Sequence, residues 1–290
     1  AVVEALRNKV SVITGGPGTG KTTILRAVCD ILKMKKITPV LAAPTGRAAQ
    51  RMGESAGVEA KTIHRLLGSE DGKFAHNEFK PLPAKFVVID EASMLDTKLA
   101  AAVVSAVPNA AHIVFVGDID QLPSVGAGNV LKDIIASGKF PVIRLERIFR
   151  QGERSQIVKA AHDILHDSDS TAEFPPNSLN FADPRRDINF IRADTPDDCV
   201  KLTTALVRDK IPAWYGCDAF SDVQVLAPMH KGVAGIENFN ASLKAALNPN
   251  ARPIFGGRLS VGDKVMQTRN NYDLDVFNGD TGRIVREADD

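Results

Sequence analysis

The chain has 290 residues, of which 44% are hydrophobic and 24% are charged, and these values exclude a chain that is disordered throughout. At this length we expect one large or two medium-sized domains. The net charge of +1 does not point to a nucleic-acid partner. Residues 1–150 hold 20 Lys and Arg and 14 Asp and Glu, whereas residues 151–290 hold 16 Lys and Arg and 21 Asp and Glu. This modest asymmetry would permit a polyanion to bind the first half of the chain, but it does not by itself indicate one.

The cysteines and the apolar runs bear on the cellular compartment. Cys29, Cys199 and Cys217 are widely spaced and form no Cys-x-x-Cys pair. This excludes a disulfide scaffold and a cysteine zinc site, and it favours a cytoplasmic protein. No apolar run approaches the roughly 20 residues that cross a bilayer, and the first one leads directly into a glycine loop. We therefore expect no signal peptide and no contact with a membrane.

Short apolar runs alternate with helical patterns in the first half of the chain. Residues Lys21–Met34 carry an apolar stripe at helical spacing. The runs themselves are nearly continuous, as is typical of parallel strands that are covered on both faces. They are Val10–Thr14, Pro39–Ala43, Phe86–Ile89, His112–Gly117 and Val142–Leu145. The alternation predicts an α/β fold with a doubly wound parallel sheet.

The pattern weakens after Gln151. Residues Asp167–Arg186 are rich in Asp, Ser and Pro, which predicts a loop or linker. Further strand signals follow at Ile188–Ile191, Val223–Ala227, Lys264–Thr268 and Gly282–Val285. We place a domain boundary near residues 148–152. Because the chain stops just after a strand signal, we expect a fragment whose second domain is incomplete.

Residues 15–22 match the pattern G-x-x-x-x-G-K-[ST] between a predicted strand and a predicted helix. Glycines let such a loop fold around an anion, the helix N-terminus adds its dipole, and Lys21 supplies a charge for the β- and γ-phosphates of a nucleotide. The alternative is a glycine-rich turn that binds nothing. The expected nucleotide contacts are Gly16, Gly18, Thr19, Gly20, Lys21, Thr22 and Thr23.

Two further strands end in polar residues. Phe86–Ile89 is followed by Asp90 and Glu91, an arrangement in which Asp90, together with Thr22, holds Mg²⁺ and Glu91 orients or deprotonates the attacking water. A strand that merely ends in two solvated acids is the alternative. The run His112–Gly117 leads into Gln121, whose carboxamide is suited to sense the γ-phosphate.

Taken together, the motifs resemble those of superfamily 1 helicases, and in particular the RecD-like, 5′→3′ branch. The resemblance spans about residues 10–285 and rests on the order of the motifs as much as on any one of them. In chain order they are residues 15–22, 43–49, 61–67, 90–93, 117–123, 147–151, 224–232, 262–272 and 276–282.

The resemblance implies two RecA-like P-loop NTPase domains with parallel sheets, an ATPase domain at residues 1–148 and a partial second domain at residues 149–290. It implies an ATP-dependent DNA helicase or translocase that uses ATP and Mg²⁺ and acts on single-stranded DNA and on single-strand/duplex junctions. The resemblance does not identify a protein partner, and we expect the protein to be a monomer. By the same resemblance Lys21, Glu91, Gln121 and Arg150 are catalytic, with Arg150 as an arginine finger and Phe149 stacked on the adenine.

The resemblance also implies a set of DNA contacts, for which short polar side chains and cations are suited. Several have structural alternatives: Thr45 and Thr62 cap helices, His64 and Phe149 are packed, and Asn278-Gly279 forms a tight turn. The contacts expected are Pro44, Thr45, Arg47, Thr62, His64, Arg65, Pro228, Lys231, Asn270, Asn271 and Asn278.

Residues Ser69–Pro83 form an insertion between two of these motifs. Asp71-Gly72 is a hairpin-turn dipeptide with Phe74 and Phe79 beyond it, which predicts a small two-stranded ribbon that projects from the first domain. The resemblance implies a strand-separating pin at this place. An ordinary surface loop is the alternative.

The chain also departs from the family pattern. The adenine-reading glutamine has no counterpart, motif VI with its further arginine is absent, and we expect the small barrel of the second domain to be missing as well. The fragment alone is therefore expected to bind nucleotide and single strands weakly. Two rival functions stay open: a nucleotide-gated binding module that does not unwind, and an RNA helicase of the same superfamily.

Overall fold

The computed structural model describes residues 1–70, 72–147, 156–166, 187–271, 274 and 276–288. The chain divides into two compact units. Unit 1 comprises Ala1–Arg154 and Thr268–Gly279, and unit 2 comprises Ser155–Gln267 and Asp280–Asp290.

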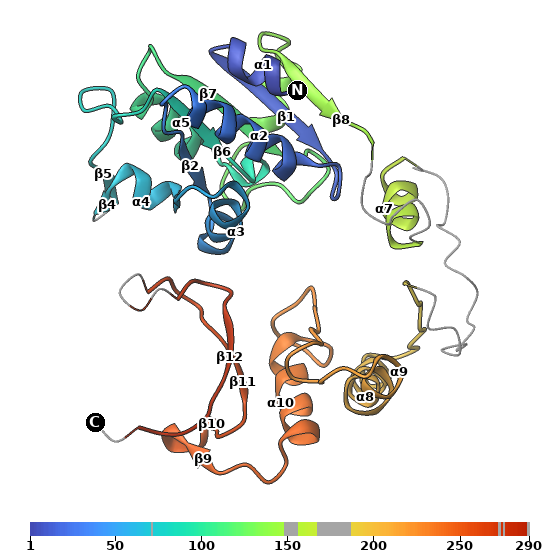
Figure 1. Ribbon diagram of the computed structural model, residues 1–290. Coiled ribbons are helices and arrows are strands. Elements are labelled where there is room, and N and C mark those ends of the chain that lie inside the picture. Colours follow the sequence, from blue (N-terminus) through green and yellow to red (C-terminus); the bar gives the residue numbers. More distant parts are fainter. Residues whose placement is uncertain (71, 148–155, 167–186, 272–273, 275, 289–290) are drawn as a thin grey trace. The chain divides into compact units, whose positions relative to one another are not determined.

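Unit 1 is built on a sheet of six parallel strands (Figure 1). The order across the sheet is β3 (Ala60–Thr62), β2 (Val40–Ala43), β6 (Phe86–Ile89), β7 (His112–Gly117), β1 (Val10–Gly15) and β8 (Val142–Leu145). Five of these strands and the parallel α/β fold are therefore confirmed predictions. Strand β3 was not predicted, because a run of three residues with a central lysine carries no strand signal.

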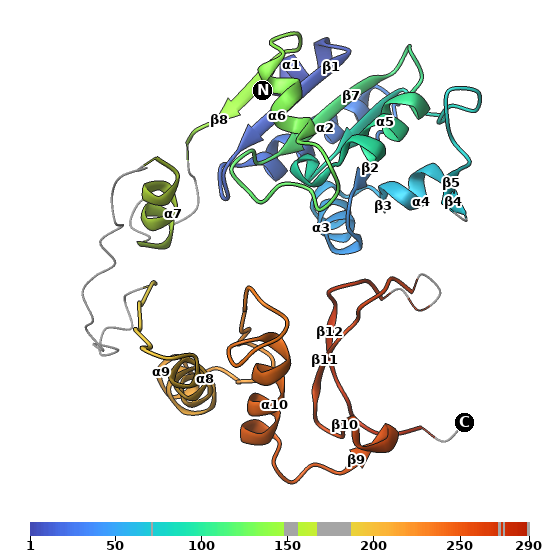
Figure 2. The same ribbon diagram turned by 180° about the vertical axis from the view of Figure 1, so that it is seen from behind.

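Helices cover both faces of this sheet, which Figures 1 and 2 show from opposite sides. Helices α1 (Val2–Arg7), α2 (Lys21–Met34) and α3 (Gly46–Ala56) pack on one face, and α4 (Ile63–Leu67), α5 (Thr97–Ala106) and α6 (Val130–Ala136) pack on the other. The helix predicted at Lys21–Met34 is confirmed as α2.

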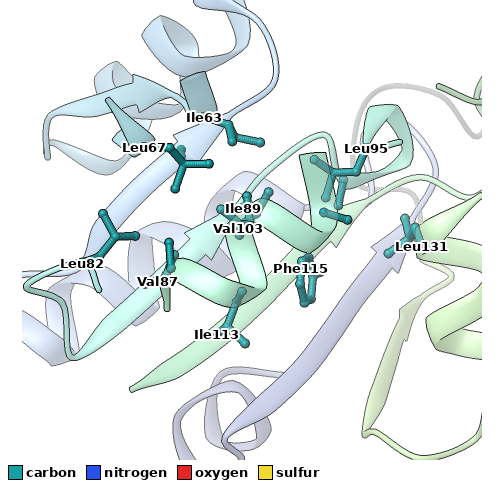
Figure 3. Packing of buried hydrophobic residues seen from close by; sticks show 14 of the residues in the cluster. Ile63, Leu67, Leu82, Val87, Ile89, Leu95, Val103, Ile113, Phe115 and Leu131 are labelled. Atoms are coloured by element: carbon teal, nitrogen blue, oxygen red, sulfur yellow. The ribbon is translucent and has the colours of Figure 1, made fainter. Parts of the chain in front are cut away.

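Successive strand residues alternate between the two cores, as the pleat of a strand requires. Val87 and Ile89 point into the core under α4, α5 and α6, whereas Phe86 and Val88 point into the core under α1, α2 and α3. Figure 3 shows the first of these cores, in which Val103 of α5 and Leu131 of α6 meet the strands. Both faces are buried, so the sheet and the strand ends that carry the candidate site are held rigidly.

The insertion after α4 begins with a short antiparallel hairpin of β4 (Ser69–Glu70) and β5 (Lys73–Phe74). Gly72 adopts a φ of 75° at the turn, a backbone conformation that glycine tolerates best. Phe74 packs at the edge of the core and lies 5.9 Å from the ring of His64, centroid to centroid. Leu82 is buried and anchors the far end of the insertion.

Unit 2 contains helices α7 (Gln156–His166), α8 (Pro196–Ala205), α9 (Ile211–Tyr215) and α10 (Ile236–Leu247), with a π-helical turn between α8 and α9. Its described strands form two antiparallel pairs, β9 (Pro253–Ile254) with β10 (Leu259–Ser260) and β11 (Lys264–Met266) with β12 (Thr281–Arg283). The strand signals at 264–268 and 282–285 thus correspond to β11 and β12.

The strands predicted at Ile188–Ile191 and Val223–Ala227 are wrong. Both segments are described, and neither has strand structure. An apolar run becomes a strand only where neighbouring strands pair with its backbone, and none of the described strands pairs with either segment. Leu226 is accordingly 88% exposed.

A polar cluster joins α10 to the strands of unit 2. Asp263 is buried and accepts hydrogen bonds from Lys244 Nζ at 2.7 Å, from Asn248 Nδ2 at 2.8 Å and from the backbone N–H of Ser260 at 2.8 Å. Burial raises the pKa of Asp263, but the hydrogen bonds from these groups and the charge of Lys244 outweigh it, so the pKa lies below its ordinary value. We call this cluster the Asp263 clamp.

Among the described residues, no helix combines the length and apolar character that crossing a bilayer requires.

Candidate functional site

The phosphate loop lies between the end of β1 and the start of α2. Gly18 and Gly20 adopt φ values of 76° and 89°, so the loop uses the conformational freedom that its glycines provide. Lys21 Nζ folds over the loop and donates to the carbonyl oxygens of Gly15 and, at 3.0 Å, Gly16. Thr19 Oγ1 donates to the Gly16 carbonyl at 2.8 Å. The amine of Lys21 therefore lies over the loop backbone, where phosphate oxygens would replace the carbonyls as its partners.

Gly15 leaves no room for a side chain. A Cβ atom at this position would lie 2.7 Å from the carbonyl oxygen of Leu145 and 2.8 Å from Thr19 Oγ1. At the neighbouring Gly16, a Cβ atom would meet nothing within 4 Å. The first glycine of the motif thus permits the close packing of β1 on β8, and the second leaves the open side of the loop free.

Asp90 and Glu91 follow β6 directly. Glu91 has a φ of 50°, unusual for a residue with a side chain, and its backbone N–H donates to Asp90 Oδ1 at 2.9 Å. Burial raises the pKa of Asp90, and it outweighs that hydrogen bond and the charge of Lys21, which both lower the pKa. The pKa of Glu91 is raised mainly by burial and also by the charge of Asp90, whereas the charge of Lys21 lowers it. A carboxylate with a raised pKa is better suited to accept a proton than an exposed one.

The third element follows β7. Asp118 is 2% exposed, and its carboxylate accepts the backbone N–H of Asp120 at 3.0 Å and Gln121 Nε2 at 3.4 Å. Asp118 therefore orients the exposed carboxamide of Gln121. Sequence reasoning missed this positioning role, although the spacing of an acid three residues before an amide was the available signal.

Strands β1, β7 and β6 are consecutive neighbours in a parallel sheet, so their carboxyl ends share one edge. The structure therefore brings together three of the four predicted catalytic residues, namely Lys21, Glu91 and Gln121. Thr22 and Thr23 are exposed at the start of α2 on the same edge. Arg150 and Phe149 lie outside the described residues.

Thr22 and Asp90, the predicted metal ligands, offer only oxygen atoms. Within the described ranges, no group of three or more His, Cys, Asp or Glu side chains could hold a metal ion. The donor set matches Mg²⁺, which takes one or two protein oxygens and completes its shell with water and phosphate.

The candidate DNA contacts of unit 1 fall into two classes. Thr45 Oγ1 accepts the N–H of Ala48 at 3.3 Å and caps α3, and Thr62 Oγ1 accepts the N–H of Arg65 at 3.2 Å and caps α4. Both threonines therefore have the capping role that the sequence left open. Pro44 is half-buried beside Thr45, whereas Arg47, His64 and Arg65 are exposed on the two helices.

Asn270, Asn271 and Asn278 lie in the segment Thr268–Gly279, which clusters with unit 1. Asn270 Oδ1 accepts the N–H of Asn278 at 2.9 Å, and Asn271 forms an antiparallel bridge with Val276. The segment is thus a narrow ribbon, and Gly279 has the φ of 95° that the predicted tight turn requires. Pro228 and Lys231 are exposed in irregular structure in unit 2.

Two contacts hold this ribbon on α3. Arg47 Nη1 donates to the Gly279 carbonyl at 3.3 Å. A Cβ atom on Gly46 would lie 2.5 Å from the ring of Phe277, so only glycine permits that ring to pack on the first turn of α3. Sequence reasoning missed Gly46 and Phe277, because nothing local connects positions so far apart in the chain.

A family model described as an AAA domain matches residues 1–178. A second model, the SH3 domain of ATP-dependent RecD-like DNA helicases, matches residues 239–290. The expectation that the family's small barrel is missing is therefore wrong. Its strands of two or three residues carry too weak a periodicity to be recognised.

The chain is 37% identical to an ATP-dependent RecD2 DNA helicase of Deinococcus radiodurans over 281 residues, which cover 96% of this chain and 36% of that protein. It is 30% identical to the RecBCD enzyme subunit RecD of Mycolicibacterium smegmatis over 321 aligned positions, which cover 98% of this chain and 56% of that protein. The chain thus spans between about a third and somewhat over half of the length of these relatives.

Among solved structures, the Pif1 helicase of Candida albicans matches with a TM-score of 0.48 and 19% identity, covering 98% of this chain and 67% of that one. The motif order, the parallel sheet and the two family matches agree. The chain belongs to the AAA domain family, and its matches to the RecD-like SH3 domain and to the RecD2 helicase support the resemblance to the RecD-like helicases of superfamily 1.

Proposed function

We propose that this chain is the motor region of an ATP-dependent DNA helicase that couples ATP hydrolysis to movement on single-stranded DNA and to duplex unwinding. ATP is the substrate, and Mg²⁺ is held by Thr22 and Asp90. The observation that supports this most strongly is the shared sheet edge of Lys21, Glu91 and Gln121. The names of the relatives, a RecD2 DNA helicase and RecD subunits, support the same class of reaction.

Each protein group has a distinct part in the proposed reaction. Lys21 exchanges its loop carbonyl partners for phosphate oxygens and stabilises the charge that develops on them. Glu91 holds the attacking water and accepts its proton, which its raised pKa favours. Gln121, oriented by Asp118, reports whether the γ-phosphate is present. When bound, Mg²⁺ supplies further neutralisation of phosphate charge. By family resemblance, Arg150 adds a cation and Phe149 stacks on the base.

The exposed cations and amides of unit 1 form the proposed DNA surface. Arg47 lies on α3 beside the ribbon that carries Asn270 and Asn278, and His64 and Arg65 lie on α4, the next helix along the chain. Thr45 and Thr62 act mainly by capping these helices, and Pro44 and Asn271 are further proposed contacts in unit 1. Pro228 and Lys231 are the proposed contacts in unit 2. Contacts of this type read the phosphate backbone, so affinity for single strands should fall with salt, with a slope of about −0.7 per phosphate neutralised.

The hairpin β4–β5 and the loop beyond it are the proposed strand-separating pin. Phe79 in this insertion is 89% exposed, so a bulky ring is available to block re-pairing of the strands. Blocking requires resistance to about 1.4 kcal/mol per base-pair step, which ATP hydrolysis in the motor supplies.

We also propose that residues 1–148, including the insertion at 69–83, form the ATPase domain. Residues 149–290 then form part of the second domain, and the match to the SH3 domain model lies at the end of this range. Three free cysteines favour a reducing cytoplasm for the protein.

The test uses the full-length protein with three measurements: ATP turnover with single-stranded DNA and with RNA of equal length, translocation on single strands, and unwinding of a forked DNA duplex. The proposal expects turnover stimulated more by DNA than by RNA, and unwinding that requires ATP. Nucleotide-dependent binding of single-stranded DNA without stimulated turnover, translocation or unwinding would support the binding-module rival. Equal or greater stimulation and unwinding with RNA would support the RNA helicase.

A variant with residues 70–80 deleted sharpens the test of the pin. It should retain DNA-stimulated turnover and translocation but lose unwinding, with Phe79→Ala as the milder variant. Val104→Ala, an equally apolar truncation at an exposed position of α5, serves as the control. Unwinding that survives the deletion would contradict the role of the insertion.

A further inference from the structure

A hollow of about 520 Å³ lies in unit 1 at the sheet edge opposite the phosphate loop. Its lining includes Lys85 and Phe86, at the start of β6, and His112, the first residue of β7. The phosphate loop follows the carboxyl end of β1, which pairs in parallel with β7. A strand of six residues separates these edges by about 20 Å, so the hollow cannot belong to the nucleotide site.

The floor of the hollow is apolar and mostly aliphatic. Leu6 of α1, Leu32 of α2 and Ile37 line it, together with the edge of Phe86. Val3 is 54% exposed and lies one helical turn before Leu6, so it extends the apolar surface along α1. The volume lies within the range that holds a small ligand or a bulky side chain.

The rim of the hollow is positively charged. Lys35, just after α2, and Lys85 both line it, both are exposed, and neither side chain makes an ion pair or hydrogen bond in the part of the chain that the structure describes. Lys9 is close by, since its Nζ donates to the carbonyl oxygen of Ala110, another lining residue. An apolar floor flanked by unpaired ammonium groups complements a ligand that is apolar in its centre and anionic at its sides.

The aromatic residue of the hollow is not available for base stacking. Phe86 is 2% exposed, and its ring stacks on His112 with 5.6 Å between centroids and 14° between planes. His112 Nδ1 is held by the Asn8 carbonyl at 2.8 Å. Single-stranded nucleic acid is bound by free aromatic faces along a continuous cationic groove, and this hollow has neither.

We propose that this hollow is a docking site for a partner protein, which inserts one bulky apolar side chain between Lys35 and Lys85 and places acidic residues of the same peptide segment against them. The site is independent of nucleotide chemistry. It gives the motor a contact surface on the side away from its ATP-binding edge.

The probe is a short fluorescein-labelled peptide, capped at both ends, with one phenylalanine between glutamates. Fluorescence anisotropy measures its binding to the protein. One matched peptide replaces phenylalanine by alanine, and a second replaces the glutamates by glutamines. A labelled single-stranded oligonucleotide serves as competitor.

Two variants test the two halves of the site. Lys35→Glu combined with Lys85→Glu reverses the rim charge, and Lys98→Glu combined with Lys132→Glu makes the same charge change at exposed positions of α5 and α6. Ala110→Trp fills the hollow from an exposed position, and Ala101→Trp places the same ring on the exposed face of α5.

The proposal expects the rim variant and Ala110→Trp each to weaken peptide binding at least about tenfold, with both controls unchanged and ADP binding retained in all four. Loss of phenylalanine or of the glutamates from the peptide should weaken binding similarly. The proposal is overturned if the wild-type protein does not bind the phenylalanine peptide saturably, if the controls lose binding equally, if the alanine peptide binds as well, or if the oligonucleotide displaces the peptide.

Discussion

Unit 1 and unit 2 are held together by different interactions. In unit 1, the four sheet strands β1, β2, β6 and β7 have four to six residues and are buried on both faces, and side chains such as Val87 and Val88 alternate between two apolar cores. In unit 2, the described strands have two or three residues, and the Asp263 clamp ties them to α10. Unit 1 therefore depends on apolar burial, and the strands of unit 2 depend on a few polar contacts.

The largest effect is expected in the core of unit 1. Phe115→Ala removes a ring that is 2% exposed at the centre of the sheet, and it should lower the free energy of unfolding of unit 1 by about 3–5 kcal/mol. Leu226→Ala in unit 2 is the matched control, because Leu226 is 88% exposed and should change nothing measurable. Hydrogen exchange of the two units during denaturation measures both. A similar loss in the two variants would remove the contrast between the units.

The next effect concerns the Asp263 clamp. Asp263→Ala leaves Lys244 and the N–H of Ser260 without their partner, which should destabilise the strands of unit 2 by about 1–3 kcal/mol. Asp209→Asn removes an ion pair of the same 2.7 Å length at an exposed position and should have no measurable effect. Exchange rates in β9–β12 report the change. Faster exchange throughout unit 1 as well would show that the clamp supports more than its own strands.

Unit 1 also makes a steric prediction at the loop. Gly15→Ala should cost about 1–3 kcal/mol of stability and weaken nucleotide binding, because its Cβ overlaps the Leu145 carbonyl. Gly16→Ala meets no neighbouring atom and should keep the stability of unit 1. Thermal melting with and without ADP separates the two. An equal loss of stability in both variants would contradict the packing of β1 against β8.

The smallest effect depends on pH. The lowered pKa of Asp263 means that its contribution to stability is present above the ordinary aspartate value of 3.8 and is lost as pH falls through the folded-state pKa. The protection factors of the amides in β9–β12, which correct for the pH dependence of the intrinsic exchange rate, should therefore fall on acidification in the wild-type protein, and the fall should be smaller in Asp263→Asn. Parallel profiles for the two proteins would show that another group governs the acid response.

The contrast between the units also explains why the sequence predicts the strands of unit 1 better than those of unit 2. The strands at Phe86–Ile89 and His112–Gly117 were predicted to the residue, because a strand buried on both faces is a continuous apolar run with polar ends. The runs at 188–191 and 223–227 have similar composition but no partner strand. Local pattern cannot distinguish the two cases, since pairing is decided by the rest of the fold.

The candidate site shows the same division. Lys21, Glu91 and Gln121 were predictable, since each follows a recognisable strand and parallel strands share an edge. The bond from Gln121 to Asp118 was missed although the two residues are only three apart in the sequence, because such a spacing alone does not show which side chains meet. The packing of Phe277 on Gly46 could not be predicted, because these residues are far apart in the chain.

We propose that the sheet edge of unit 1 binds ATP and hydrolyses it in response to DNA. The direct measurement compares ATP affinity and ATP turnover, with and without single-stranded DNA, for the full-length wild-type protein, Lys21→Ala and Glu91→Gln. We expect DNA to stimulate wild-type turnover, Lys21→Ala to abolish it with weaker ATP binding, and Glu91→Gln to keep near-normal ATP binding while turnover falls by ~10²-fold or more. Equal loss of ATP binding in both variants, or wild-type turnover that does not respond to DNA, would contradict the account.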